Sequence, residues 1–248
     1  MHMDGTVFWI AAVVAAMLVG MGKGGMPVVG MLGVPVLSLV ISPVTAAGLL
    51  LPVYVVSDMF GLYAYRQAFD RRVVGIMAVG ATVGIGIGWA TAAIVPERVV
   101  TGLVGLIGAV FALNLLMRRG QPASARAAAV GPGLFWGMLT GFTSFVSHAG
   151  APPFQVYVQP LRLQKAVFAG TSTVLFAYVN AVKLIPYVAL GQINVASLKT
   201  AAVLAVPAAI AVFAGVRLVK VLPEALFFRL VTWALLAVSL KLMWDSVH

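Results

Sequence analysis

Four ionisable residues of this sequence stand inside long apolar runs, where a charged side chain is costly. Lys23 lies in the segment MGKGGMP and His148 in the segment SHAGAPP, whereas Asp58 and Lys183 lie near the middle of two uninterrupted apolar runs. An unpaired charge costs several kcal/mol in hydrocarbon, so each of these side chains is expected to face the protein interior. Two cations, an imidazole and a carboxylate suit the binding of an anion or the transfer of a proton.

Lys23 and His148 occupy segments in which glycine and proline keep the backbone from being helical. The free backbone N–H groups and helix amino termini at such a break favour an anion, which Lys23 would coordinate. His148 would donate to the same anion or carry a coupled proton. Two plainer interpretations stay open. Lys23 would then reach an interface or lie at an ordinary turn, and His148 would be a structural residue.

Asp58 and Lys183 also allow two interpretations. They lie at similar places in the two halves of the chain, so a structural ion pair between them would join the halves. Alternatively, Asp58 is a proton site and Lys183 is a second anion contact. Residue type and position do not separate these interpretations.

Polar side chains and glycines near these residues complete the predicted site. Hydroxyl, amide and exposed backbone N–H groups suit an oxoanion, which needs many donors and few fixed charges. The competing interpretation is that small hydroxyl residues only pack helices together. Asp58 and His148 are the predicted proton-coupling candidates. The predicted substrate-binding residues are Lys23, Gly24, Gly25, Ser147, His148, Gly150, Gln155, Thr171, Ser172, Thr173, Asn180 and Lys183.

Composition places the chain in a lipid bilayer. Of its 248 residues, 62% are hydrophobic and 9% are charged. A soluble domain keeps roughly 25% charged residues, so the composition argues against a soluble enzyme, a nucleic-acid module or a disordered chain. The formal net charge of +10 is then a topology signal rather than a sign of a polyanion partner. The absence of cysteine excludes a disulfide framework and a thiolate metal site.

No enzyme, metal or cofactor chemistry is predicted. The histidines are His2, His148 and His248, and no carboxylate pair stands at ligand spacing beside His148. An intramembrane aspartyl hydrolase would need a second mid-span carboxylate besides Asp58. The sequence also lacks the phosphate-binding motif G-x4-G-K-S/T. The predicted partners are therefore a small anion and the bilayer, with a homodimer left open and no nucleic acid.

Apolar runs without strand-like alternation favour membrane helices over barrel strands. Two runs, Val7–Ile41 and Gly131–Leu161, are broken by glycine and proline. The arm Pro153–Leu161 would be only ~15 Å long as a helix, half of the hydrocarbon thickness, which favours a re-entrant hairpin. The predicted uninterrupted spans are Val44–Tyr65, Val73–Val95, Val99–Met117, Ala166–Leu190, Thr200–Val219 and Leu226–Trp244.

The chain also contains a weak internal repeat. Lys23–Pro27 aligns with His148–Pro152, and Val95–Glu97 aligns with Leu222–Glu224, in the same order on either side of the polar stretch RRGQPASAR. Each half is predicted to hold one broken hairpin followed by three spans. The predicted organisation is a first membrane repeat over residues 1–120, a cytoplasmic linker over residues 121–130 and a second membrane repeat over residues 131–248.

Positive charge predicts the orientation, because Lys and Arg concentrate in cytoplasmic loops. Arg71 and Arg72 mark one loop as cytoplasmic, and Arg118 marks the linker, so both termini fall outside. An odd number of spans per repeat inserts the second repeat upside down. The predicted fold is therefore an all-α integral membrane protein of two inverted-topology repeats. Hairpins that enter from opposite faces would bring Lys23 and His148 together near the midplane.

Two segments and the repeat carry a family resemblance. The segments are GKGGMPVVGMLGVPVL and FAGTSTVLFAYVNAVKLIPYVALGQI. Over nearly its whole length, the sequence resembles the sulfite exporter TauE/SafE family of bacterial membrane proteins. Lys23 and His148 depart from the more uniformly glycine-rich turn of that family. The positions that match the signature regions of the family are the Gly22–Pro27 turn, the His148–Pro152 turn, the Thr171–Thr173 cluster and the Asn180–Lys183 pair.

The resemblance implies a permease that exports sulfite, sulfoacetate or a related carbon–sulfur metabolite from the cytoplasm. Together with the repeat, it predicts a secondary transporter in the bacterial cytoplasmic membrane, with alternating access to a midplane site. An anion channel and a structural membrane protein that transports nothing are the alternatives.

Overall fold

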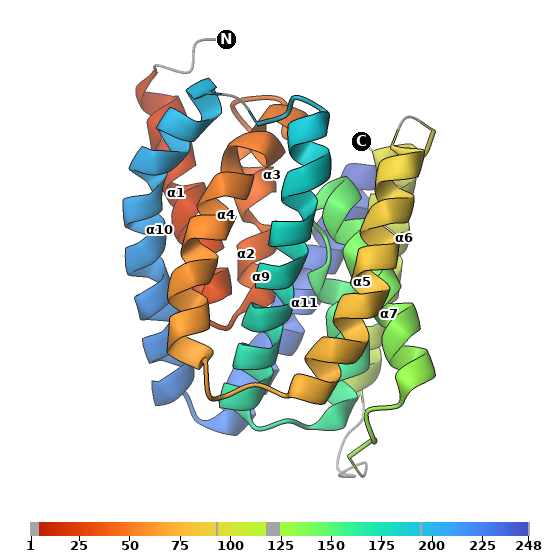
Figure 1. Cartoon of the computed structure of the whole chain (residues 1–248). Coiled ribbons are helices and arrows are strands. Elements are labelled where there is room, and N and C mark those ends of the chain that lie inside the picture. The colour runs from red at the N-terminus through yellow and green to blue at the C-terminus, as the bar shows by residue number, and fades with distance from the viewer. Residues whose placement is uncertain (1–4, 93, 118–124, 194, 248) are drawn as a thin grey trace.

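The protein is a bundle of long helices, seen in a computed structural model that describes residues 5–92, 94–117, 125–193 and 195–247 (Figure 1). Within these ranges all regular structure is helical, which confirms the predicted all-α fold. The helices are α1 (Thr6–Lys23), α2 (Pro27–Met31), α3 (Gly33–Leu37), α4 (Pro43–Tyr65), α5 (Arg71–Thr91), α6 (Glu97–Met117), α7 (Val130–Ser147), α8 (Ala151–Val158), the 3-10 helix η1 (Gln159–Leu161), α9 (Lys165–Ala189), α10 (Val195–Val221) and α11 (Glu224–Val247).

Seven of the described helices, namely α1, α4, α5, α6, α9, α10 and α11, are long and apolar enough to cross a membrane. Six of them coincide with the six uninterrupted spans that the sequence predicts, within a few residues at each end. The fold is thus that of a multi-pass membrane protein. Part of the predicted linker, residues 121–124, lies outside the described residues.

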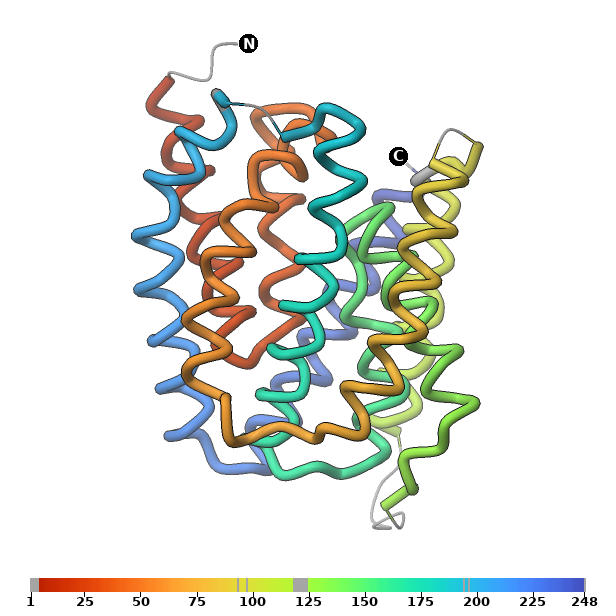
Figure 2. Tube along the Cα trace, viewed as in Figure 1, coloured from red at the N-terminus to blue at the C-terminus, as the bar shows by residue number. Residues whose placement is uncertain are grey.

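The first broken run folds back on itself. Helix α1 ends at Lys23, and α2 and α3 then return along it, so that a Cβ on Gly22 would lie 2.6 Å from the Cα of Gly30. Backbones can approach this closely only where both residues are glycine. Figure 2 shows that the start of α1 and the end of α3 lie at the same end of the bundle.

The second broken run also enters and leaves at one end of the bundle. Helix α7 stops at His148, whose backbone is left-handed (φ 53°, ψ 19°), and α8 runs back beside it. The backbone N–H of Arg126 donates to the carbonyl of Pro160 at 3.0 Å, which ties the start of the hairpin to its end. The described geometry is therefore that of a hairpin, as the shortness of its second arm predicts.

Helices from the two sequence halves pack in pairs, namely α1 with α10, α4 with α9, α5 with α7 and α6 with α11. Glycine makes the α5–α7 contact close. A Cβ on Gly84 would lie 1.9 Å from the carbonyl oxygen of Met138, and a Cβ on Gly141 would lie 2.1 Å from that of Ala81. The spacing Gly80-x3-Gly84-x3-Gly88 therefore serves close helix packing. The relation of the two halves by inverted topology stays a prediction.

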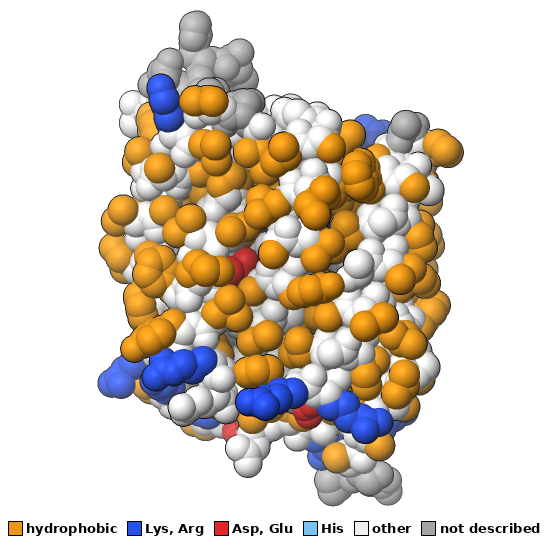
Figure 3. Space-filling model, in the orientation of Figure 1, with side chains coloured by type: hydrophobic (Ala, Val, Ile, Leu, Met, Phe, Trp, Pro, Cys, Tyr) orange, Lys and Arg blue, Asp and Glu red, His pale blue; other side chains and the backbone are white. Residues whose placement is uncertain are grey.

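The Lys and Arg side chains on the surface gather toward the ends of the bundle (Figure 3). Figure 3 shows a largely hydrophobic surface with Lys and Arg gathered at the lower end, which we call the basic end. Lys165 donates there from Nζ to the carbonyl of Lys220 at 3.1 Å. The basic end comprises the end of α4 and the start of α5, the start of α9, and the α10–α11 turn, with Arg66, Arg71, Arg72, Arg162, Lys165, Arg217, Lys220 and Arg229.

Candidate functional site

The last residue of α1 carries a buried charge that is paired. Lys23 Nζ lies 2.7 Å from Oδ1 of Asp58 in α4, and the two side chains are 6% and 2% exposed. Asn180 in α9 donates from Nδ2 to the other carboxylate oxygen at 2.8 Å. Asp58 is thus held from both sequence halves. Asp58 does not form an ion pair with Lys183. The sequence interpretation that paired these two residues was therefore wrong, because the partner of Asp58 is Lys23.

Lys183 in α9 is also fully buried, yet its partners are neutral. Its ammonium donates to the carbonyl and the hydroxyl of Ser144 at 2.9 and 3.3 Å, and it faces Nδ1 of His148 at 3.4 Å. Three acceptors match the three N–H donors of a charged lysine. Among the described residues, no carboxylate lies within salt-bridge distance of Lys183.

The contacts of His148 define its tautomer. A protonated Lys183 can only donate, so with Lys183 charged Nδ1 accepts from it and the ring proton is on Nε2, which lies 2.8 Å from the hydroxyl oxygen of Tyr187. That hydroxyl in turn donates to the carbonyl of Phe145 at 3.3 Å. The imidazole is therefore neutral, with both nitrogens engaged. A left-handed backbone at a residue other than glycine is uncommon, and here it ends helix α7.

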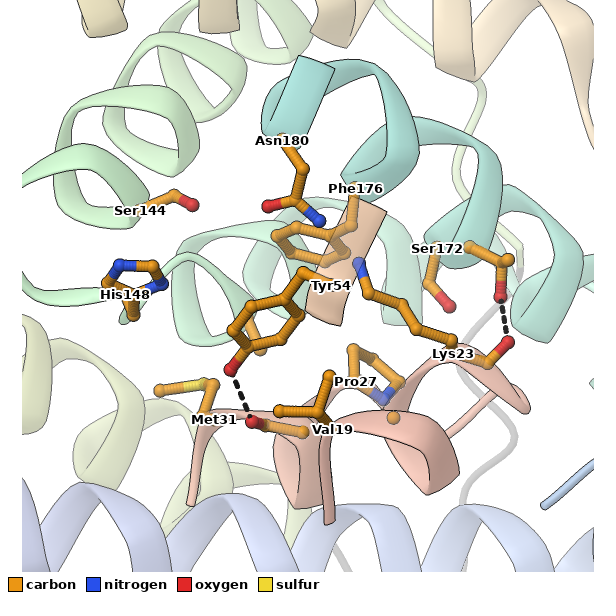
Figure 4. Close-up of a pocket in the computed structure, with 14 residues that line it drawn as sticks. Val19, Lys23, Pro27, Met31, Tyr54, Ser144, His148, Ser172, Phe176 and Asn180 are labelled. Atoms are coloured by element: carbon orange, nitrogen blue, oxygen red, sulfur yellow. Dashed lines mark hydrogen bonds between the residues drawn. The ribbon is translucent and has the colours of Figure 1, made fainter. Parts of the chain in front are cut away.

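An aromatic ring separates Lys23 from His148. The ring of Tyr54 stacks on the imidazole with 5.7 Å between centroids and an interplanar angle of 21°. Lys23 lies on the side of Tyr54 away from His148 (Figure 4), with its Nζ 5.1 Å from the centroid of the Tyr54 ring and 5.9 Å from that of the Phe176 ring. The Tyr54 hydroxyl donates to the carbonyl of Gly30 at 2.8 Å, which holds the ring in place (Figure 4).

These side chains surround a small central cavity where the two hairpins meet (Figure 4). Its volume is about 40 Å³ for the centres of water-sized molecules, enough for a few waters or one small oxoanion. The residues that line it are Val19, Gly22, Lys23, Pro27, Gly30, Met31, Tyr54, Ser144, His148, Ala151, Ser172, Thr173, Phe176 and Asn180.

Five of the predicted substrate-binding residues line this cavity, namely Lys23, His148, Ser172, Thr173 and Asn180. Lys183 lies directly behind it, because its partners Ser144 and His148 are both lining residues.

The other predicted residues lie outside the lining. The Thr171 hydroxyl accepts from the backbone N–H of Asp70 at 2.9 Å, and Gln155 accepts from Gln159 at 2.7 Å. Ser147 donates to the carbonyl of Thr143 at 3.2 Å. Gly24, Gly25 and Gly150 shape the backbone of the two breaks, and a Cβ on any of them would lie within 3.0 Å of a neighbouring atom.

The sequence interpretation did not include the aromatic residues of the site. Tyr54 precedes Asp58 by four residues and Tyr187 follows Lys183 by four, and residues at this spacing share a helix face. That spacing is the signal that would have found both tyrosines. Phe176 offers the same spacing to Asn180.

A second cavity, the distal cavity, lies toward the end of the bundle opposite the basic end. Its volume is about 200 Å³, and it reaches from the start of α4 and the ends of α5 and α9 to His148. His148 thus lines both cavities. The distal cavity is lined by Val34, Pro43, Val44, Ala47, Thr91, Ala92, Val95, Phe145, Val146, Ser147, His148, Tyr187, Leu190 and Gln192.

Tight contacts close the central cavity toward the basic end. The Tyr65 hydroxyl donates to the carbonyl of Gly24 at 2.7 Å, and the Thr173 hydroxyl donates to that of Lys23 at 3.1 Å. Gly25 has a positive φ of 110°, and a Cβ there would lie 2.6 Å from the side chain of Ala169. Side chains of α4 and α9 therefore hold the first break in place.

Apolar spanning helices around a charged cavity, which lies between two broken helices, define a membrane transporter. The family model described as sulfite exporter TauE/SafE matches residues 7–242, nearly the whole chain. The protein therefore belongs to the TauE/SafE family, whose members are transporters of the sulfite exporter type rather than enzymes. No curated protein and no solved structure matches the chain.

Proposed function

We propose that this protein is a secondary transporter that exports a small sulfur-containing anion, such as sulfite or an organosulfonate, by alternating access at the central cavity. The observation that carries the proposal is the placement of two buried lysines, Lys23 and Lys183, at or directly behind a cavity between two broken hairpins. Fixed cations in a low dielectric attract an oxoanion, and breaks in spanning helices are where transporters bind their substrates. The family supports the sulfur-containing class.

The positive-inside rule supports an orientation for this transporter. The basic end would face the cytoplasm, and the distal cavity and both ends of the described chain would face outside (Figure 1). The membrane would be the bacterial cytoplasmic membrane.

The orientation is testable because the natural chain has no cysteine. We expect Arg71→Cys to react with a membrane-impermeant thiol reagent only from the cytoplasmic side, and Val195→Cys only from the outside. Both positions are exposed in the structure. Reaction of both cysteines from the same side would contradict the proposed orientation.

The two cavities support alternating access. His148 and its hydrogen bond to Tyr187 separate the central cavity from the distal one, and the contacts of Gly24 and Lys23 close the opposite side. Opening the first barrier would expose the site to the outside, and opening the second would expose it to the cytoplasm. The pairing of α1 with α10 and of α5 with α7 supports two related halves around this site.

Export of an anion requires no further energy source. Moving one negative charge outward through an inside-negative potential releases about 2.3 kcal/mol per 100 mV. Uniport of a monoanion is therefore feasible, with Asp58 and His148 as the candidates if protons are coupled.

The test is counterflow of labelled sulfite in proteoliposomes. We expect saturable exchange in the parent and a loss of at least about tenfold in affinity for Lys23→Gln, because a charge-assisted hydrogen bond to the anion is removed. The matched control is Lys241→Gln, since Lys241 is exposed and pairs with Asp245 on the bundle surface. Flux that does not saturate would indicate a channel. No anion flux at all in the parent would indicate a structural protein.

A further inference from the structure

The buried charges of the central region do not cancel. Within the described chain, the buried acidic and basic side chains are Lys23, Asp58, His148 and Lys183. Lys23 and Asp58 form a neutral pair at 2.7 Å. His148 is neutral because Nδ1 accepts from Lys183 while Nε2 lies 2.8 Å from the Tyr187 hydroxyl. With Lys183 protonated, the empty site carries one net positive charge.

A single net charge fits a singly charged ligand. In a medium of low dielectric an uncompensated charge is strongly disfavoured, so the most stable complex is the one whose total charge is zero. A monoanion brings the site to neutrality. A dianion of the same shape leaves one negative charge without a partner.

The available hydrogen-bond donors agree with this count. The hydroxyls of Ser172 and Thr173 donate to the backbone carbonyls of Ala169 and Lys23, at 2.7 and 3.1 Å. They accordingly have no proton left for an anion. The remaining side-chain donors at the cavity are the N–H groups of Lys23 and Asn180 that do not face Asp58, and the hydroxyl of Ser144, whose oxygen accepts from Lys183. These few hydrogen-bond donors are enough to bind a sulfonate group, whereas a dianion needs more of them.

We propose that the central site selects singly charged sulfonate-type anions over doubly charged oxoanions of the same size, and that the net charge contributed by Lys183 sets this selectivity. The inference rests on the proposed function, since it specifies the charge of the substrate at the same cavity. Lys183 acts here through charge, from behind Ser144 and His148, and Asp58 acts by cancelling the charge of Lys23.

Methanesulfonate and sulfate are the probes, because both are tetrahedral at sulfur and similar in size, but they carry one and two charges. The measurement is the dissociation constant of each ion for the purified full chain in one detergent at one ionic strength. We expect the parent to bind methanesulfonate at least about 100-fold more tightly than sulfate. In Asp58→Asn the net charge rises by one, and this ratio should fall at least about tenfold.

A charge-matched control separates selectivity from damage. The double variant Lys23→Gln/Asp58→Asn replaces a neutral ion pair by a neutral amide pair, so both affinities fall while their ratio is kept. Lys183→Gln provides an independent measurement if Asp58→Asn does not fold. It removes the net charge and should weaken methanesulfonate binding at least about 30-fold.

Equal affinity of the parent for the two ions would overturn the charge rule while leaving anion transport intact. Retention of the full ratio in folded Asp58→Asn, or of parental methanesulfonate affinity in folded Lys183→Gln, would overturn it equally. Binding of neither ion to a parent that exchanges sulfite in proteoliposomes would also refute the selectivity. If the parent neither binds an anion nor exchanges sulfite, the proposed function fails with it.

Discussion

Lys23 and Lys183 are both buried in the bundle, but their surroundings differ. Lys23 has a carboxylate partner at 2.7 Å, whereas Lys183 has only a carbonyl, a hydroxyl and an imidazole nitrogen as acceptors. The first lysine lines the central cavity, and the second lies behind it. The comparison teaches that the direct contact and the net charge of a site can come from different residues. In the proposed site, Lys23 would orient the anion, while a charged Lys183 would make the region positive.

The largest effect on stability is expected when the ion pair between Lys23 and Asp58 is broken. Asp58→Asn leaves the ammonium of Lys23 buried without a counter-charge, which should lower the free energy of unfolding by about 3–5 kcal/mol. Thermal unfolding of the purified protein measures this loss. The double variant Lys23→Gln/Asp58→Asn should recover most of the stability. If the double variant is less stable than the single one, the pair is not the source of the effect.

A smaller loss is expected at the second lysine. Lys183→Met keeps the apolar stem and leaves only neutral acceptors unsatisfied, so the cost should be about 1–3 kcal/mol. Sulfite exchange in this variant should nevertheless be almost lost although the protein stays folded, because the net charge of the site is gone. The same unfolding measurement and the counterflow assay check the two parts. A stability loss as large as that of Asp58→Asn would contradict the proposed difference between Lys23, which has a charged partner, and Lys183, which has only neutral partners.

The smallest effect is expected at the hydrogen bond between His148 and Tyr187, which separates the central cavity from the distal cavity. Tyr187→Phe removes the hydrogen bond to His148 but keeps the ring, and a loss of about 1 kcal/mol would increase opening about fivefold. A cysteine at Met31, in the central cavity, should then react correspondingly faster with a membrane-impermeant reagent added outside.

The matched control for that experiment is Ser147→Cys. Ser147 lines the distal cavity, so its reaction rate should not depend on the hydroxyl of Tyr187. An unchanged rate at Met31→Cys would show that His148 and Tyr187 do not form the outer barrier.

Much of the fold could be predicted from composition and from the position of glycine and proline. Uninterrupted apolar runs longer than the hydrocarbon thickness can only be spanning helices, so six of the predicted spans agree with the structure. The glycine spacing in α5 indicated close packing, which the contacts with Met138 and Leu134 confirm. Local sequence determines such features.

The site was less accessible to sequence reasoning, because it depends on contacts between distant segments. The repeat predicted that Lys23 and His148 are close, and Asn180 was predicted as one of the polar residues around them; the three line one cavity. The partner of Asp58 was not predicted correctly, since two buried lysines were available and only the three-dimensional path of α1 decides between them. Tyr54 was overlooked because aromatic residues are common in any membrane helix, and its role depends on what it stacks against.

The close glycine contacts have a mechanical consequence. A Cβ on Gly20 would lie 2.1 Å from the carbonyl oxygen of Ala208, which locks α1 to α10 as Gly84 locks α5 to α7. Each locked pair takes one helix from either sequence half. A rotation of one sequence half against the other would have to slide the helices past each other at both contacts, α1–α10 and α5–α7. If the protein works by alternating access, as we propose, its rigid bodies would each combine helices from both sequence halves. The predicted sequence repeats would then not be the units that move.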